Sequence, residues 1–221
     1  MDVPPMSETS TIVTAEHFKY IAAHTSPEGD FLQDLKRQAG AAGLPAIWIA
    51  PEQAAFMQIL LKLCRAREVV EVGTLAGYSA IAMARALPPE GRVRTIEVID
   101  KHADFAEQWI RRSDVADRIT VHRGDGRQVL PGFAADSADA AFIDADKESY
   151  PLYLRECLRI VRRGGLIMAD NALAHGNIVD ERSTDPMVPI VQVFNDLVTQ
   201  VQELHGIIVP IGDGCWVAVK Q

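Results

Sequence analysis

The stretch that decides the fold is residues 69–79, which read Val69-Val70-Glu71-Val72-Gly73-Thr74-Leu75-Ala76-Gly77-Tyr78-Ser79. A short apolar run carries an acidic residue near its end, two glycines four positions apart follow, and a helical pattern begins at Ser79. This order predicts a buried strand, a tight turn, and a helix whose free N–H groups face the turn. Such a unit forms a nucleotide-type site in an open α/β sheet. A βα turn without any ligand is the alternative at this point.

Strands and helices alternate along the rest of the chain. Strands are predicted at residues 92–97, 119–122, 138–143 and 165–169, and helices at residues 101–113, 126–130, 150–162 and 189–201. Two last strands, at residues 206–210 and 215–219, are joined by a hairpin-like connection. This alternation predicts an α/β fold with a mostly parallel sheet, helices on both faces and one antiparallel strand near the C-terminus.

Helical segments also come before the first strand. Residues 15–22 and 28–42 have helical patterns, and Pro51 opens a third helix at a favoured first-turn position. We expect residues 13–66 to form an N-terminal helical layer and residues 1–12 to be a flexible tail. Because no repeats or low-complexity linkers interrupt the chain, we expect one domain over residues 1–221.

Composition limits the classes of function. The 221 residues are 48% hydrophobic and 24% charged, with a formal net charge of −8, so a nucleic-acid partner is not expected. No apolar run approaches the ~20 residues of a membrane helix, and residues 1–5 lack the pattern of a signal peptide. Cys64, Cys157 and Cys215 lie in apolar segments without metal-type spacing. We therefore expect reduced cysteines, no membrane association and a cytoplasmic location.

An acidic residue, Glu97, ends the second predicted strand. In a doubly wound sheet this position lies beside the first turn, where a carboxylate can accept hydrogen bonds from ribose hydroxyls. A water-facing carboxylate is the alternative. A nicotinamide-dependent oxidoreductase would share the feature, but Leu75 stands where its glycine fingerprint requires the middle glycine, which disfavours that class.

Polar side chains follow two further strands. Asp144, Asp146 and Lys147 come after the strand 138–143, and Asp170 and Asn171 come after the next. Because the carboxyl ends of neighbouring parallel strands lie ~5 Å apart, the side chains of Asp144, Asp170 and Asn171 are expected to converge, with Lys147 as the one cation beside them. Oxygen donors of this kind suit Mg²⁺. Loop caps and a solvated lysine are the alternatives.

These motifs together resemble one family. The combination includes Glu71-Val72-Gly73-Thr74 with Gly77-Tyr78-Ser79, Phe142-Ile143-Asp144-Ala145-Asp146-Lys147 with Tyr150, Gly164-Gly165-Leu166-Ile167, Asp170-Asn171 and Pro210-Ile211-Gly212-Asp213-Gly214. From about residue 27 to residue 220 the chain is similar to the cation-dependent O-methyltransferases that use S-adenosylmethionine, such as the caffeoyl-CoA and catechol enzymes and their bacterial relatives. The resemblance implies a Rossmann-like methyltransferase fold with a seven-stranded sheet, and a homodimer.

The resemblance also implies a role for each site residue. The methionine part of the cofactor would be held by Glu71, Gly73, Thr74 and Ser79. The ribose would be bound by Glu97, and the adenine pocket would be lined by Asp125 and Gly126. Asp146 would lie near the cofactor and Ile49 would contribute through its backbone. Asp144, Asp170 and Asn171 would bind the metal, which is Mg²⁺ or another divalent cation such as Ca²⁺ or Mn²⁺, and Lys147 matches the proposed general base.

Some positions depart from the plant enzymes. Ile49 replaces a threonine, so any hydroxyl contact there is lost. After Asp170-Asn171 the chain reads Ala172-Leu173-Ala174-His175-Gly176, without the tryptophan and asparagine of the plant sequences. These changes put the plant acceptor in doubt but leave the chemistry unchanged. His175 is either an acceptor contact or an ordinary loop histidine.

The sequence therefore predicts Mg²⁺-dependent methyl transfer from S-adenosylmethionine to one hydroxyl of a catechol-like small molecule, a phenolic acceptor. Asp144 and Lys147 are the predicted catalytic residues. A hydroxylated tRNA uridine is an alternative acceptor, although the acidic balance argues against it. A nicotinamide-dependent oxidoreductase and a non-catalytic binding protein are less favoured alternatives.

Overall fold

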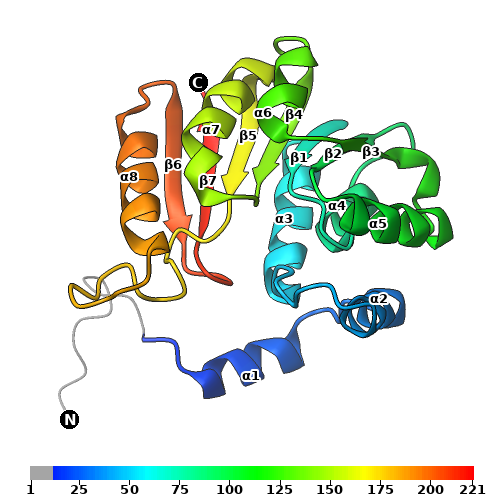
Figure 1. The fold of residues 1–221 in the computed structure, drawn as a ribbon, viewed down its shortest axis with the longest axis horizontal. Coiled ribbons are helices and arrows are strands. Elements are labelled where there is room, and N and C mark those ends of the chain that lie inside the picture. The colour runs from blue at the N-terminus through cyan, green and yellow to red at the C-terminus, as the bar shows by residue number, and fades with distance from the viewer. Residues whose placement is uncertain (1–11) are drawn as a thin grey trace.

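A seven-stranded sheet forms the centre of the protein in a computed structural model that describes residues 12–221 (Figure 1). The strands are β1 (Glu68–Val72), β2 (Arg92–Glu97), β3 (Ile119–Arg123), β4 (Ala138–Ile143), β5 (Val161–Ala169), β6 (Leu204–Val209) and β7 (Cys215–Lys220). Their order is β3-β2-β1-β4-β5-β7-β6, and β7 runs antiparallel to both neighbours. This confirms the predicted sheet with its antiparallel C-terminal strand. The predicted tail falls almost wholly on residues 1–11, outside the described part.

Helices cover both faces of this sheet (Figure 1). They are α1 (Ala15–His24), α2 (Asp30–Ala41), α3 (Pro51–Leu63), α4 (Tyr78–Ala86), α5 (Asp100–Arg112), α6 (Gly126–Val129), α7 (Tyr150–Ile160) and α8 (Met187–Gln200), with short 3₁₀ turns at Ala116–Arg118, Leu130–Gly132 and Lys147–Ser149. None is long and apolar enough to span a bilayer among residues 12–221.

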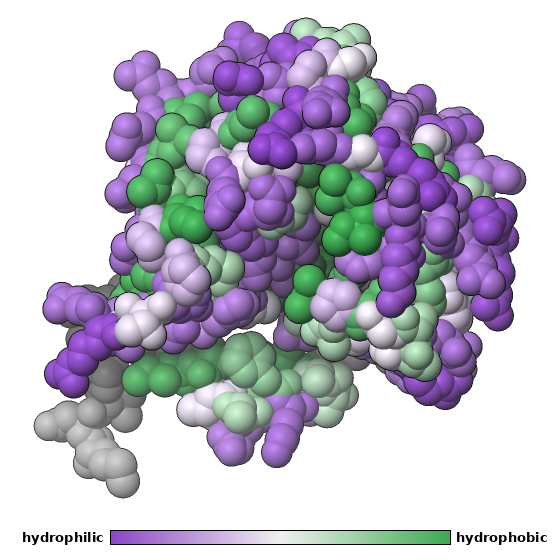
Figure 2. All heavy atoms as spheres, in the orientation of Figure 1, coloured by the Kyte–Doolittle hydropathy of each residue, from purple (hydrophilic) through white to green (hydrophobic). Residues whose placement is uncertain are grey.

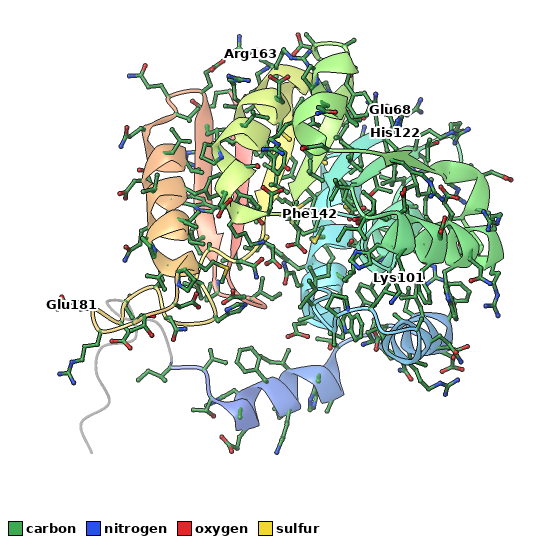
Figure 3. The ribbon with its side chains drawn as sticks, viewed as in Figure 1. Glu68, Lys101, His122, Phe142, Arg163 and Glu181 are labelled. Carbon is green, nitrogen blue, oxygen red and sulfur yellow. The ribbon has the colours of Figure 1, made fainter. Side chains whose placement is uncertain are left out.

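The strands alternate their side chains between two hydrophobic cores. Val69 and Phe142 face a core that includes α2, α3, α4 and α5, whereas Val70 and Ile143 face the core beneath α7 and α8. Figure 3 places Phe142 near the middle of the sheet. The central strands are apolar on both faces because helices cover both faces, which is typical of a parallel sheet.

The three N-terminal helices differ in how closely they pack against the rest of the protein. Leu35 of α2 and Met57 of α3 are completely buried, and Gln58 of α3 donates to the carbonyl of Ala82 in α4 at 2.7 Å. Helix α1 has no buried residue and lies apart from the sheet (Figure 1). Figure 2 shows apolar surface along this helix. Only the second and third helices of the predicted layer therefore belong to the core.

The largest boundary error in the prediction lies between α7 and β5. The helix expected over residues 150–162 ends at Ile160, and β5 begins at Val161 instead of Gly165. Val161 pairs with Ala138 of β4, and Arg162 donates to the carboxylate of Asp139 at 2.7 Å. Val161 is buried, and a buried residue fits either a helix or a strand pattern. The pairing with β4 decides between them, and no local signal shows it.

The sheet order places the site. From β1 the chain moves outward through β2 to β3, and then returns to β4 on the other side of β1. This reversal leaves a crevice beyond the carboxyl ends of β1 and β4, where ligands bind in open α/β sheets. The residues that follow β1, β2, β4 and β5 meet at this edge.

Candidate active site

A cavity of about 630 Å³ lies at this edge of the sheet. It is lined by most of the predicted site residues, namely Ile49, Gly73, Thr74, Ser79, Glu97, Asp125, Gly126, Asp144, Asp146, Lys147 and Asn171. Two predicted residues, Glu71 and Asp170, lie behind its wall. Its polar lining residues fall into two groups, one beside the β1–α4 turn and one at the ends of β4 and β5.

The β1–α4 turn needs both of its glycines. Gly73 has φ +103°, and a side chain there would collide with the carbonyl oxygen of Asp144. Gly77 caps α4 in the left-handed region at φ +84°. Because residues with a Cβ rarely adopt these dihedrals, the turn holds the ends of β1 and β4 in direct contact.

Behind this turn lies a buried carboxyl group, Glu71. Ser79 donates to its Oε1 at 2.5 Å, while its Oε2 is buried and has no hydrogen-bond partner among the described residues. Burial raises the pKa of Glu71 to about 8, although the hydrogen bond from Ser79 opposes the shift. An unpartnered buried oxygen of this kind can accept a hydrogen bond from a ligand's amino group.

Glu97 is the last residue of β2 and faces the same turn. Its Oε2 accepts the N–H of Leu75 at 2.8 Å, and its Oε1 accepts the N–H of Ile99 at 2.9 Å. His102 of α5 lies 3.6 Å from Oε1. A carboxylate can accept about four hydrogen bonds, so the two backbone donors fix its orientation and leave lone pairs for hydroxyl groups.

Asp125 and Gly126 begin α6 on the next side of the cavity. The Asp125 carboxylate accepts the backbone N–H of Arg127 at 2.8 Å and pairs with its guanidinium, which lowers the pKa of Asp125. A Cβ on Gly126 would press against the ring of Tyr153. Tyr153 donates in turn to Asp146 at 2.6 Å. The backbone of Gly126 therefore packs closely against Tyr153, and the carboxylates of Asp125 and Asp146 are each held by a neighbouring hydrogen-bond donor.

Two carboxylates converge at the ends of β4 and β5. Burial, together with the nearby charge of Asp144, raises the pKa of Asp170 to about 6. Lys147 lies 3.2 Å from Oδ1 of Asp144 and donates to the hydroxyl of Tyr150 at 2.6 Å. Burial raises the pKa of Tyr150 well above its usual range, so its hydroxyl stays protonated. A buried and a partly buried acid that repel each other favour a cation between them.

Two further side chains orient this group from outside the cavity. Gln53 of α3 is buried and donates to Oδ1 of Asp170 at 2.8 Å. Asp213, in the β6–β7 turn, accepts from Nδ2 of Asn171 at 3.1 Å. Sequence reasoning missed both roles, because each contact joins residues far apart in the chain.

The donor set fits a hard divalent cation. Asp144 and Asp170 supply carboxylate oxygens, and the amide of Asn171, whose nitrogen faces Asp213, leaves its oxygen toward the cavity. Within residues 12–221 no three His, Cys, Asp or Glu side chains are grouped to hold a metal. Asn171 is the residue beside these two carboxylates whose side chain could supply a third oxygen.

The mouth of the cavity is more apolar. Trp48 and Ile49 line it from the segment before α3, and Met187 lines it from the start of α8. Tyr78, the residue after Gly77, also lines it and donates to Glu28 at 2.8 Å. His175 lines the opposite side with its side chain mostly exposed, 3.7 Å from Asp185. Neither interpretation of His175 is tested by this contact.

Comparisons with known proteins agree with this architecture. The O-methyltransferase family profile matches residues 22–221. A catechol O-methyltransferase of Niastella koreensis is 41% identical over 179 residues, which cover 80% of this chain and 81% of that protein. Caffeoyl-CoA O-methyltransferase 1 of Eucalyptus globulus is 30% identical over 174 residues, which cover 74% of this chain and 70% of that protein.

A solved structure adds the cofactor class. The O-methyltransferase of Bacillus cereus in complex with SAH superposes with a TM-score of 0.83 at 34% identity, covering 92% of this chain and 96% of that one. These matches decide against the nicotinamide-dependent oxidoreductase and against a non-catalytic binding protein. The chain belongs to the O-methyltransferase family, whose members transfer the methyl group of S-adenosylmethionine.

Proposed function

We propose that this enzyme methylates one hydroxyl of a catechol-like small molecule and that it requires a divalent cation. The observation that carries the proposal is the grouping of Asp144, Asn171 and Lys147, which line the cavity, with Asp170 directly behind them at the ends of β4 and β5. The names of the Niastella and Eucalyptus relatives support a phenolic acceptor.

The β1–α4 end would hold the cofactor. When bound, S-adenosylmethionine supplies a methyl group on a positively charged sulfur. Oε2 of Glu71, the buried oxygen without a partner, would accept from the amino group of the methionine part. The free lone pairs of Glu97 would accept the ribose hydroxyls. Thr74, Asp125, Gly126 and Asp146 would complete the walls, with Ile49 contributing through its backbone.

The other end would hold the acceptor beside the cation. Asp144, Asp170 and Asn171 would hold a divalent ion, which when bound supplies positive charge that favours the ionised form of a neighbouring hydroxyl. Catechols fit this end because two adjacent oxygens can share one cation. The partly apolar cavity would align the acceptor with the methyl donor and exclude water.

Lys147 is the side chain placed to handle the proton. Its Nζ lies between Asp144 and the hydroxyl of Tyr150, at the end of the cavity where the acceptor would bind. It would either take the proton of the reacting hydroxyl or, as an ammonium, stabilise the oxyanion. Because Tyr150 remains protonated, the tyrosine positions the lysine and does not compete with it as a base.

An acceptor screen with methyl-labelled S-adenosylmethionine tests the proposal. We expect labelled product from catechols, with loss of turnover on chelation and recovery on adding Mg²⁺. Asp170→Ala should abolish turnover while leaving cofactor affinity within about threefold, because the cation contacts the acceptor. Full activity with chelator present would contradict a catalytic metal. Incorporation into bulk tRNA, without any catechol product, would favour the hydroxylated uridine instead.

A further inference from the structure

The amide of Asn171 is the one group of this site that could face the cavity with either its oxygen or its nitrogen. Its two ends have nearly the same shape, but only the oxygen can bind a cation. Asn171 also adopts a left-handed backbone at φ +63°, in a segment where Ala174 and His175 have φ +48° and +55°. Such dihedrals persist only where the surroundings hold them. A contact that holds this backbone and also sets the direction of the amide would determine whether the oxygen faces the cavity.

Asp213 contacts both the backbone of this segment and the amide of Asn171. Its Oδ2 accepts the backbone N–H of His175 at 2.8 Å and Nδ2 of Asn171 at 3.1 Å. A backbone N–H can only donate, so the oxygen it meets is an acceptor, and the amide of Asn171 must turn its nitrogen toward that oxygen. The oxygen of Asn171 is left facing the cavity that the side chain lines.

The β6–β7 turn is tied to this segment by its backbone as well. Ala172 donates to the carbonyl of Gly214 at 2.8 Å, and Leu173 donates to the carbonyl of Asp213 at 2.9 Å. The turn and the segment after β5 lie at the same end of the sheet in Figure 1, whereas Glu181 marks the outward tip of that segment in Figure 3. Removing the Asp213 side chain would leave these backbone contacts in place.

We infer that Asp213 is a positioning residue that selects the metal-binding orientation of the Asn171 amide. The inference rests on the proposed function, because it assumes that Asn171 is a metal ligand. It assigns Asp213 no contact with acceptor or cofactor. The carboxylate of Asp170 has a separate side-chain support, because Gln53 of α3 donates to its Oδ1.

A Mn²⁺ titration tests the inference without turnover. Binding is measured as the loss of the electron paramagnetic resonance signal of the free ion. We expect Asp213→Ala to weaken Mn²⁺ binding by ~10–100-fold, the usual effect of losing a residue that orients a metal ligand. Asp213→Asn should stay within about threefold of the native enzyme, because the introduced amide oxygen can accept both N–H groups. Asp180→Ala, in an exposed part of the same segment, is the matched control.

A double-mutant cycle separates orientation from scaffolding. Asn171→Asp places an oxygen on both sides of the ligand, so orientation no longer matters, and Asp213→Ala in that background should not weaken Mn²⁺ binding. An equal loss in both backgrounds would mean that Asp213 only supports the loop. If Asp213→Asn loses as much as Asp213→Ala, the effect is one of charge. Either result overturns the inference.

The same titration distinguishes a failure of the proposed metal site from a failure of the Asp213 inference. If the native enzyme binds no Mn²⁺, the metal site of the proposed function fails, and the inference fails with it. If the native enzyme binds Mn²⁺ and Asp213→Ala binds it equally well, the inference alone fails. Cofactor affinity, measured by calorimetry on each variant, should stay within about threefold and reports that the cavity is folded.

Discussion

Lys147 makes the contacts that are expected of a residue that acts on the acceptor. Because its Nζ is held by Asp144 and Tyr150, we predict that Lys147→Ala lowers kcat by ~10²-fold or more, the scale of a positioned proton transfer. Lys147→Arg keeps the charge but cannot serve as a base, so its kcat distinguishes the two roles. Steady-state kinetics at saturating metal and acceptor measure both, with Lys62→Ala as an exposed control. An unchanged kcat for Lys147→Ala from pH 6 to 9 would mean that this lysine takes no part in the reaction.

Glu97 is held by two backbone donors, so its carboxylate is already oriented before any ligand binds. We predict that Glu97→Ala weakens S-adenosylmethionine binding by ~1–3 kcal/mol, the range for hydrogen bonds to a charged group. Calorimetric titration measures the change, and Glu90→Ala, at an exposed turn, is the control. Equal affinities for Glu97→Ala and the native enzyme would remove Glu97 from the site.

Glu71, which lies behind the β1–α4 turn, should make the free energy of unfolding depend on pH. Burial raises its folded pKa to about 8, above the ordinary value of 4.5, so the folded state binds the extra proton between these values. The free energy of unfolding should therefore fall as pH rises from about 4.5 to about 8, by up to ~1.4 kcal/mol per pH unit from this group. Denaturant titrations of Glu71→Gln should lack this part of the slope. A difference between the two proteins that does not vary with pH would contradict the assigned shift.

At the scale of single elements, the β1–α4 turn is the most restrictive segment. Gly73→Ala should destabilise the protein by at least ~1–3 kcal/mol, because it combines a strained positive φ with a collision against Asp144. Gly40→Ala in α2 is the matched control. Its added methyl group meets open space in a helix, so it should stabilise the protein by ~0.5–1 kcal/mol. Denaturant midpoints measure both changes, and two equal effects would exclude a special constraint at Gly73.

The elements also show what a sequence can predict. The strand–turn–helix unit around Gly73 and the convergence of Asp144 with Asp170 follow from local pattern and from the common edge of parallel strands. Gln53 and Asp213 do not, because the sequence around each gives no sign of the distant side chain it contacts. The start of β5 at Val161 was missed for the same reason, since pairing with β4 and not propensity sets it. Glu71 was predicted as a cofactor contact, and only the structure shows that it is completely buried with Ser79 donating to it.

For the whole molecule, helix α1 bears on the expected homodimer. It has no buried residue within the chain and carries the partly exposed apolar side chains Phe18 and Ile21. Large exposed apolar surface is typical of protein interfaces. We predict a dimer mass by light scattering at micromolar concentration, and a shift toward monomer for Phe18→Asp with Ile21→Asp. A monomeric mass for the native protein would contradict the dimer.

The contact between Gly73 and the backbone of Asp144 has a consequence for how this enzyme can diversify. It fixes the separation between the β1–α4 turn and the end of β4 through the ladder of the sheet, which no loop mutation can lengthen. We therefore expect substrate range to vary mainly through segments outside that ladder, such as residues 45–50 and 172–187, which supply Trp48, His175 and Met187 to the cavity lining. Libraries restricted to these two segments should yield altered acceptor preferences at a far higher frequency than libraries spread over the strand ends.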